Sequence, residues 1–124
     1  MKIDASPVRR RHWQLWVWLS YWLGLFIIMH VPASGLGKIG FRYSDYVFHF
    51  VSYFFLVLLG GRYLFAKQRA STATLLRYAA LYCVYAAFDE WLQQFVRRTM
   101  SLGDWLADAS GVLIATLWLL RRSL

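Results

Sequence analysis

Cysteine, proline and acidic residues are all scarce in this chain. Its 124 residues include one cysteine, two prolines and six acids, and charged residues make up 16% of the total. A single cysteine, Cys83, excludes a disulfide within the chain and a metal site built from several thiolates. Soluble domains usually contain about 25% charged and about 45–50% apolar residues, whereas hydrophobic residues make up 60% of this sequence. The composition therefore excludes a disordered chain and argues against a water-soluble globule.

Four hydrophobic stretches predict membrane-spanning helices at about 13–30, 46–65, 78–96 and 102–120. Stretches of roughly 18–20 residues are long enough for a helix to cross the hydrocarbon core of a bilayer. The first stretch is followed by His30 and Pro32 instead of a cleavage site, so we interpret it as a retained span and not as a signal peptide. The predicted fold is an all-α, integral membrane four-helix bundle, which forms a single domain over residues 1–124.

The basic residues are divided unevenly between the two sides of the predicted bundle. Ten fall on the side of the two termini: Lys2, Arg9, Arg10, Arg11, Arg62, Lys67, Arg69, Arg77, Arg121 and Arg122. Four fall on the other side: Lys38, Arg42, Arg97 and Arg98. Because cytoplasmic loops are enriched in Lys and Arg, both termini are predicted to be cytoplasmic, in a multi-pass protein of the bacterial inner membrane. The basic residues are scattered over separate loops, so nucleic acid is not an expected partner.

Five of the six acids fall at the outward ends of the second, third and fourth stretches: Asp45, Asp89, Glu90, Asp104 and Asp108. Residues four apart share a helix face, which aligns Asp45 with His49, Asp89 with Gln93, Glu90 with Gln94, and Asp104 with Asp108. One acid near a helix end is adequately explained as a solvated or capping group. Several ionisable groups at one membrane depth indicate a functional site instead, because each is costly in a bilayer without a partner.

The predicted ligand-binding cleft consists of His30, Asp45, His49, Asp89, Glu90, Gln93, Arg98, Ser101, Asp104 and Asp108. No cofactor is expected, but a divalent cation remains open, with Asp45, His49, Glu90, Asp104 and Asp108 as candidate ligands. Adjacent helix positions point about 100° apart, so Asp89 and Glu90 are predicted to face different partners. Arg98 is predicted to pair with Glu90 or Asp104, because a bidentate Arg–carboxylate pair is stronger than an exposed one.

Small residues recur every four positions on two of the stretches. They are Ala79, Cys83 and Ala87 on the third, and Ala107, Gly111 and Ala115 on the fourth. Small side chains at this spacing let helices approach closely in a membrane. We therefore predict that both stripes are packing surfaces.

Three groups of residues share their spacing with a known family. They are His30 with Pro32; Asp45, His49, Tyr53 and Phe54; and Asp89-Glu90-x-x-Gln93 followed by Arg98-x-x-Ser101-x-x-Asp104, Asp108 and Gly111. Together they resemble the motifs of the VanZ-like family of small membrane proteins, over residues 15–120. The resemblance implies an inner-membrane protein with an accessory role in resistance to the glycopeptide teicoplanin, and with no settled biochemical activity. It does not by itself imply antibiotic resistance for this chain.

The chain departs from the family pattern at three positions. Tyr46 stands where the family often has Lys, Arg97 replaces a frequent Pro-Gly pair, and Asp108 stands where Asn is common. These differences predict a different ligand, or a different balance of charge in the same cleft.

Three functions are compatible with the cleft. The first is an envelope-associated binding or accessory protein that recognises membrane lipids, a cell-wall lipid intermediate or a lipoglycopeptide. The second is a hydrolase or transferase acting on a lipid head group, although no Gly-x-Ser-x-Gly or His-Glu-x-x-His motif supports an enzyme. The third is a small proton-coupled exporter, although the first span carries no acid. The binding protein is the preferred hypothesis, no catalytic residue is assigned, and the oligomeric state is not determined by the sequence.

Overall fold

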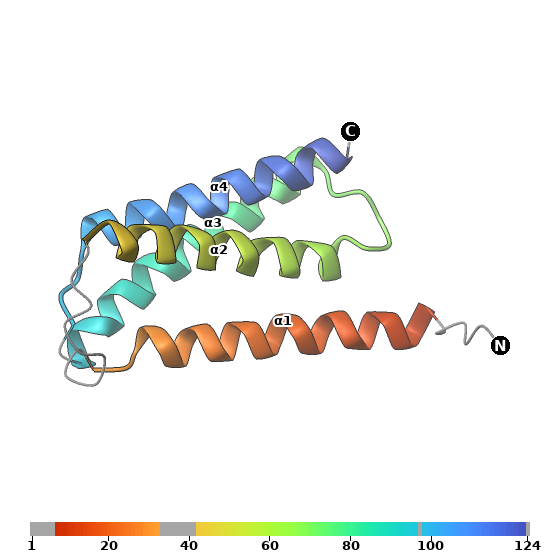
Figure 1. Cartoon of the computed structure of the whole chain (residues 1–124). Helices are drawn as coiled ribbons and strands as arrows, with labels where there is room; N and C mark the ends of the chain where they lie inside the picture. The colour runs from red at the N-terminus through yellow and green to blue at the C-terminus, as the bar shows by residue number, and fades with distance from the viewer. Residues whose placement is uncertain (1–6, 33–41, 97, 124) are drawn as a thin grey trace.

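The described part of the chain is all-helical. A computed structural model describes residues 7–32, 42–96 and 98–123, and these residues contain no β-strand. Four long helices follow one another (Figure 1): α1 (Pro7–Met29), α2 (Arg42–Leu64), α3 (Thr72–Gln93) and α4 (Leu102–Ser123), with a short 3₁₀ helix η2 (Gln94–Val96) after α3. The predicted helical fold is confirmed. The third helix ends earlier than predicted, because the chain tightens into η2 at Gln94.

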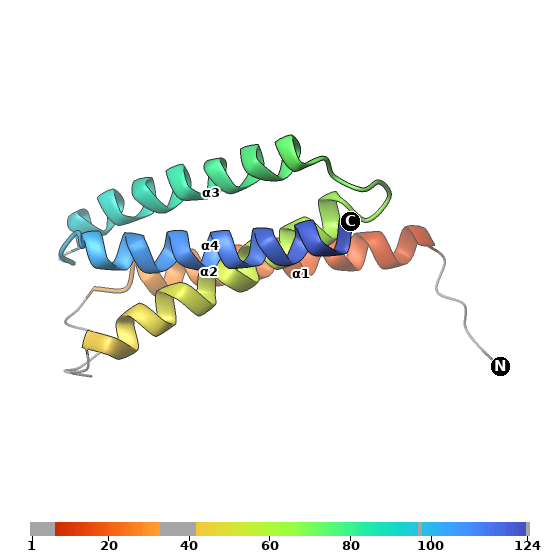
Figure 2. The ribbon, with the colours of Figure 1, turned by 90° about the horizontal axis from the view of Figure 1, so that it is seen from above.

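Helix α2 lies at the centre of the arrangement. It packs most extensively against α4 and also against α1, while α3 packs mainly against α4. Figures 1 and 2 show that the start of α1, the end of α2, the start of α3 and the end of α4 lie at one end of the bundle. The opposite end brings together the end of α1, the start of α2, the end of α3 and the start of α4.

Serine side chains cap the N-termini of two helices, α3 and α4. The Oγ of Ser71 accepts a hydrogen bond from the backbone N–H of Thr74 at 3.1 Å. The Oγ of Ser101 accepts one from the backbone N–H of Asp104 at 3.3 Å. Each bond satisfies a helix N–H that has no partner within its own helix. The sequence therefore fixes the first turns of α3 and α4 locally.

The closest helix contact is between α2 and α4. Gly111 is buried, and a Cβ atom at this position would collide with the backbone oxygen of Phe50. Ala115, one turn further along α4, is also fully buried. The predicted packing role of the small residues on α4 is confirmed. On α3, Ala79 is buried but Ala87 is exposed, so the predicted stripe there is wrong at its far end, which faces away from the neighbouring helices.

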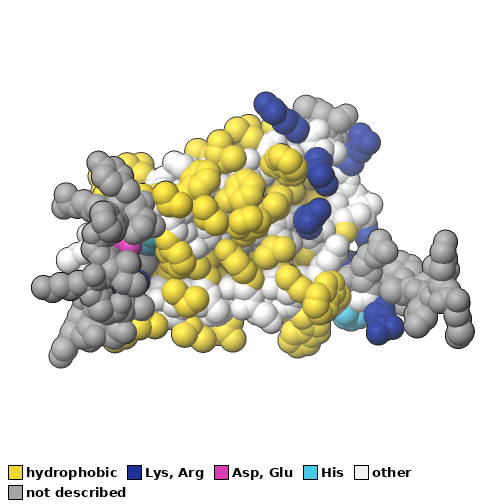
Figure 3. Space-filling model, viewed as in Figure 1, with side chains coloured by type: hydrophobic (Ala, Val, Ile, Leu, Met, Phe, Trp, Pro, Cys, Tyr) yellow, Lys and Arg dark blue, Asp and Glu magenta, His cyan; other side chains and the backbone are white. Residues whose placement is uncertain are grey.

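Large apolar side chains cover the outside of the bundle. Exposed examples occur on every helix, including Trp16 and Leu23 on α1, Val51 and Phe55 on α2, Leu81 and Val84 on α3, and Leu113 and Leu117 on α4. Figure 3 shows that apolar side chains cover much of one face between the two ends of the molecule. Soluble proteins rarely expose apolar patches of this extent.

Two of the helices are long and apolar enough to cross a membrane. These segments are Asp45–Leu64 in α2 and Leu102–Arg122 in α4. Helix α1 starts with arginines and is rich in Trp, and α3 carries Arg77, Asp89 and Glu90, which lowers the apolar character of both.

Candidate functional site

His49 is the centre of a cluster of polar side chains at one end of the bundle. Its Nδ1 lies 2.9 Å from Oδ1 of Asp108 and 3.7 Å from Oε1 of Glu90, and its Nε2 lies 3.9 Å from Oδ2 of Asp104. The His49 and Glu90 side chains are buried and Asp108 has no exposed surface at all. The predicted alignment of Asp104 with Asp108 is confirmed, since both carboxylates face the same imidazole.

Glu90 is held by the turn between α3 and α4. Its Oε2 accepts a hydrogen bond from the backbone N–H of Ser101 at 3.2 Å, and its Oε1 accepts one from Nε2 of Gln93 at 3.4 Å. Gln94 is exposed in η2, so the predicted alignment of Glu90 with Gln94 is wrong. Gln93, which is buried, is the glutamine that lies beside Glu90.

Asp89 belongs to a neighbouring contact between α1, α2 and α3. Its Oδ1 lies 3.7 Å from Nε2 of His30, and its Oδ2 accepts a hydrogen bond from the Tyr53 hydroxyl at 3.4 Å. Glu90, by contrast, faces His49. The prediction that these two adjacent acids have different partners is confirmed.

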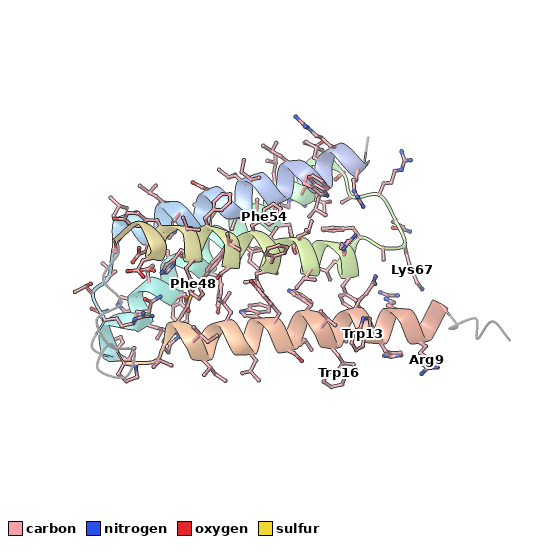
Figure 4. The ribbon with its side chains drawn as sticks, in the orientation of Figure 1. Arg9, Trp13, Trp16, Phe48, Phe54 and Lys67 are labelled. Carbon is pink, nitrogen blue, oxygen red and sulfur yellow. The ribbon has the colours of Figure 1, made fainter. Side chains whose placement is uncertain are left out.

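A polar cavity of about 310 Å³ adjoins this cluster. Its lining residues are Asp45, Phe48, His49, Gln93, Arg98, Thr99 and Asp104. Asp45 is exposed, so this acid of the predicted cleft lies at the rim and not in the buried cluster. Figure 4 places Phe48 near this end of α2, whereas Arg9 and Lys67 lie at the other end of the molecule.

Arg98 forms no ion pair with the acids that the structure describes. Its Nη1 donates a hydrogen bond of 2.7 Å to the backbone oxygen of Met29, and no carboxylate of the described residues lies within 4.0 Å of it. The predicted ion pair with Glu90 or Asp104 is therefore wrong. Met29 is the last residue of α1, and a cation that binds a free helix carbonyl also interacts favourably with the helix dipole. Arg97 lies outside the described residues.

Several buried polar atoms of the site have no hydrogen-bond partner. They are Oδ2 of Asp108, Oδ1 of Asp89 and Nε2 of His30. The last two face each other as an ion pair at 3.7 Å, whereas Oδ2 of Asp108 has no such partner among the described residues. A buried carboxylate oxygen without a partner is costly, and in a native structure it indicates an ion, a water molecule or a functional role.

Sequence analysis did not include Tyr53, Phe48 and Thr99 among the site residues. Tyr53 lies four residues after His49 and is fully buried, so the spacing of these two residues was a usable signal. Thr99 lies in the turn after η2, where no periodic pattern indicates which side chain will face the cavity.

Comparison with protein-family models, curated proteins and solved structures finds no match to this chain. The interpretation of the site therefore depends on its own geometry. Its charges are three carboxylates around one imidazole, with the guanidinium of Arg98 bound to a helix end nearby. Such a site is suited to a ligand that carries positive charge, or to a head group with both phosphate and hydrogen-bond donors.

Proposed function

We propose that the chain is a four-span membrane protein with both termini in the cytoplasm. All four helices have exposed apolar side chains, which supports a lipid environment for α1 and α3 as well as for α2 and α4. The described basic side chains at the end that holds the start of α1 are Arg9, Arg11, Arg62, Lys67, Arg69, Arg77, Arg121 and Arg122. Figure 3 shows dark blue Lys and Arg side chains gathered at this end. The positive-inside rule assigns this end to the cytoplasm of a bacterial inner membrane.

Cysteine labelling tests the orientation. In a Cys83→Ser background, Gln68→Cys in the α2–α3 loop should react only with a probe that reaches the cytoplasmic face. Thr99→Cys should react from the outside. The opposite pattern would contradict the proposed topology.

We further propose that the polar cavity binds the head group of a membrane amphiphile at the outer surface. The observation that carries this proposal is a charged cavity of about 310 Å³ at the end of a bundle with apolar outer faces. A lipid in the adjoining leaflet can keep its chains against the apolar faces while its head group enters the cavity. The site would then act by recognition, as in a binding or accessory protein of the cell envelope.

The lining residues favour a head group with a phosphate and a cationic or hydroxyl end. A guanidinium has five N–H donors, and the bond to Met29 uses only one nitrogen of Arg98. Arginine binds phosphate well through such donors. Asp45 and Asp104 can accept hydrogen bonds from an ammonium or hydroxyl group. Phospholipids and isoprenoid-linked cell-wall intermediates have this chemistry. Both are present in the membrane in which a VanZ-like accessory protein would lie.

Native mass spectrometry of the reconstituted protein tests this function. The probes are phosphatidylethanolamine and a polyprenyl diphosphate, and saturable binding of at least one is expected. Thr99→Trp should weaken binding at least tenfold, because Thr99 is exposed at the cavity and a large side chain would fill it. Gln68→Trp, in the loop at the other end, is the matched control and should bind normally. Absence of saturable binding, or full binding by Thr99→Trp, would overturn the proposal.

A further inference from the structure

We infer that His49, Glu90 and Asp108 form a binding site for a divalent transition-metal ion, in the buried layer beneath the polar cavity. Each of the three residues offers one ligand atom, and these atoms lie within 4.8 Å of one another. The residues come from three different helices, α2, α3 and α4, so an ion there would join the helices at their outward ends. This inference goes beyond head-group recognition and does not depend on it.

The donor atoms are nearly as close together as those of a metal coordination shell. With metal–ligand bonds of about 2.1 Å, neighbouring donors in tetrahedral or octahedral shells lie roughly 3.0–3.4 Å apart. The Nδ1 of His49 is 2.9 Å from Oδ1 of Asp108 and 3.7 Å from Oε1 of Glu90, and the three ligand atoms all lie within 4.8 Å of one another. An ion would draw the Glu90 carboxylate closer to the other two ligands.

An independent observation also indicates a ligand. Asp108 has no exposed surface, yet its Oδ2 has no hydrogen-bond partner, although its Oδ1 already contacts the imidazole. The carboxylate is therefore directed into the cluster with one oxygen unsatisfied. A cation bound by both oxygens of the Asp108 carboxylate would satisfy Oδ2 and offset the repulsion from Glu90 and Asp104. No Lys or Arg of the described residues forms an ion pair with these acids.

Neighbouring groups orient two of the three ligands, His49 and Glu90. The Nε2 of His49 lies 3.9 Å from Oδ2 of Asp104, so the imidazole can bind a metal through Nδ1 while its other nitrogen faces a carboxylate. Metal-bound histidines commonly have such a carboxylate partner, which orients the ring. Glu90 is oriented by the backbone N–H of Ser101 and by Gln93.

The donor set selects the class of ion. Imidazole favours Zn²⁺ and similar transition metals over Mg²⁺ and Ca²⁺, which prefer oxygen ligands alone. Three protein ligands leave a fourth position open, as in zinc sites that bind water or substrate. Because His49 also lines the polar cavity, the ion can enter by that route and can contact a cavity ligand.

Isothermal titration of the purified, metal-free protein in detergent with Zn²⁺ alone tests the site. The expected result is one Zn²⁺ per chain, at least 100-fold weaker binding for Glu90→Gln and Asp108→Asn, and about 10–100-fold weaker binding for Asp104→Asn. Gln94→Ala is the matched control, an exposed polar residue at the same end that is neither one of the three ligands nor part of the cavity lining, and should bind as the wild type does. The same series with Mg²⁺ should show much weaker binding.

Thermal unfolding is a second measurement, which tests the site even if a variant is too unstable for the titration. Zn²⁺ should raise the melting temperature of the wild type and of Gln94→Ala, but not that of Glu90→Gln, whose carboxamide can still accept the Ser101 hydrogen bond. Fewer than one bound Zn²⁺ per wild-type chain, unchanged binding in both ligand variants, or equal affinity for Mg²⁺ would each overturn the inference. No lipid is present in these experiments, so their failure would leave head-group binding untouched, and failure of head-group binding would leave the metal site untouched.

Discussion

The two ends of the bundle differ in whether their charged side chains are exposed or buried. At the end with the start of α1, the described side chains of Arg62, Lys67 and Arg77 are exposed. At the other end, His49, Glu90 and Asp108 are buried among three helices. Exposed charges near a membrane surface cost little and serve mainly to orient the protein. Buried charges are costly and persist only with partners, which is why we propose that the end with His49, Glu90 and Asp108 is the functional one.

The largest expected effect comes from removing the imidazole at the centre of the buried cluster. His49→Ala leaves three carboxylates without their shared partner, and leaving a buried carboxylate without its partner costs about 3–5 kcal/mol. Equilibrium unfolding in mixed micelles without metal measures this change. Arg62→Ala, on the same helix but exposed at the basic end, should unfold as the wild type does. Equal free energies of unfolding for the two variants would show that the buried polar cluster contributes no more to stability than the exposed basic end.

A smaller effect is expected where α2 and α4 approach each other. In Gly111→Val the new side chain collides with the backbone of Phe50, and overpacking of this kind costs about 1–3 kcal/mol. Since Asp108 lies one turn away on α4, separating the helices should also lengthen the contact between His49 and Asp108 and weaken Zn²⁺ binding. Gly24→Ala on α1, where a Cβ atom meets nothing within 4 Å, is the control.

The two adjacent acids of α3 should give different defects. Asp89→Asn removes the charge beside His30 and should lower the free energy of unfolding by about 1–2 kcal/mol while Zn²⁺ binding is retained. Glu90→Gln should keep most of the stability, because Gln can accept from Ser101, but should lose Zn²⁺. Thermal unfolding and zinc titration of both variants provide the comparison. The prediction fails if both variants lose the same property.

The smallest effect is expected for Arg98→Lys. Because the Arg98 side chain donates one hydrogen bond, to the backbone oxygen of Met29, a lysine can replace it, and the free energy of unfolding should change by less than about 0.5 kcal/mol. Arg98→Ala leaves that oxygen unpaired and should cost about 1 kcal/mol. If lysine proved as harmful as alanine, a bidentate partner such as a carboxylate or a bound phosphate would be the better explanation.

Much of the fold could be predicted from the sequence, because it depends on local patterns. The hydrophobic stretches gave the four helices, although η2 ended the third one early. The i, i+4 spacing of Asp104 and Asp108, and the 100° between Asp89 and Glu90, gave the correct faces because helix geometry is fixed within one element. Tyr53 and Thr99 were not included, since their place in the site depends on which helices meet and how the α3–α4 turn is shaped.

The sequence by itself determined the helices, the separation of basic from acidic ends and the polar residues that share a face, since these follow from composition and helical periodicity. Only the tertiary structure decided the partners. It placed His49 rather than Arg98 beside the buried carboxylates, bonded the Arg98 side chain to the backbone of α1, and left Oδ2 of Asp108 unsatisfied. Such pairings depend on the distance and rotation between helices far apart in the chain, which no local pattern specifies.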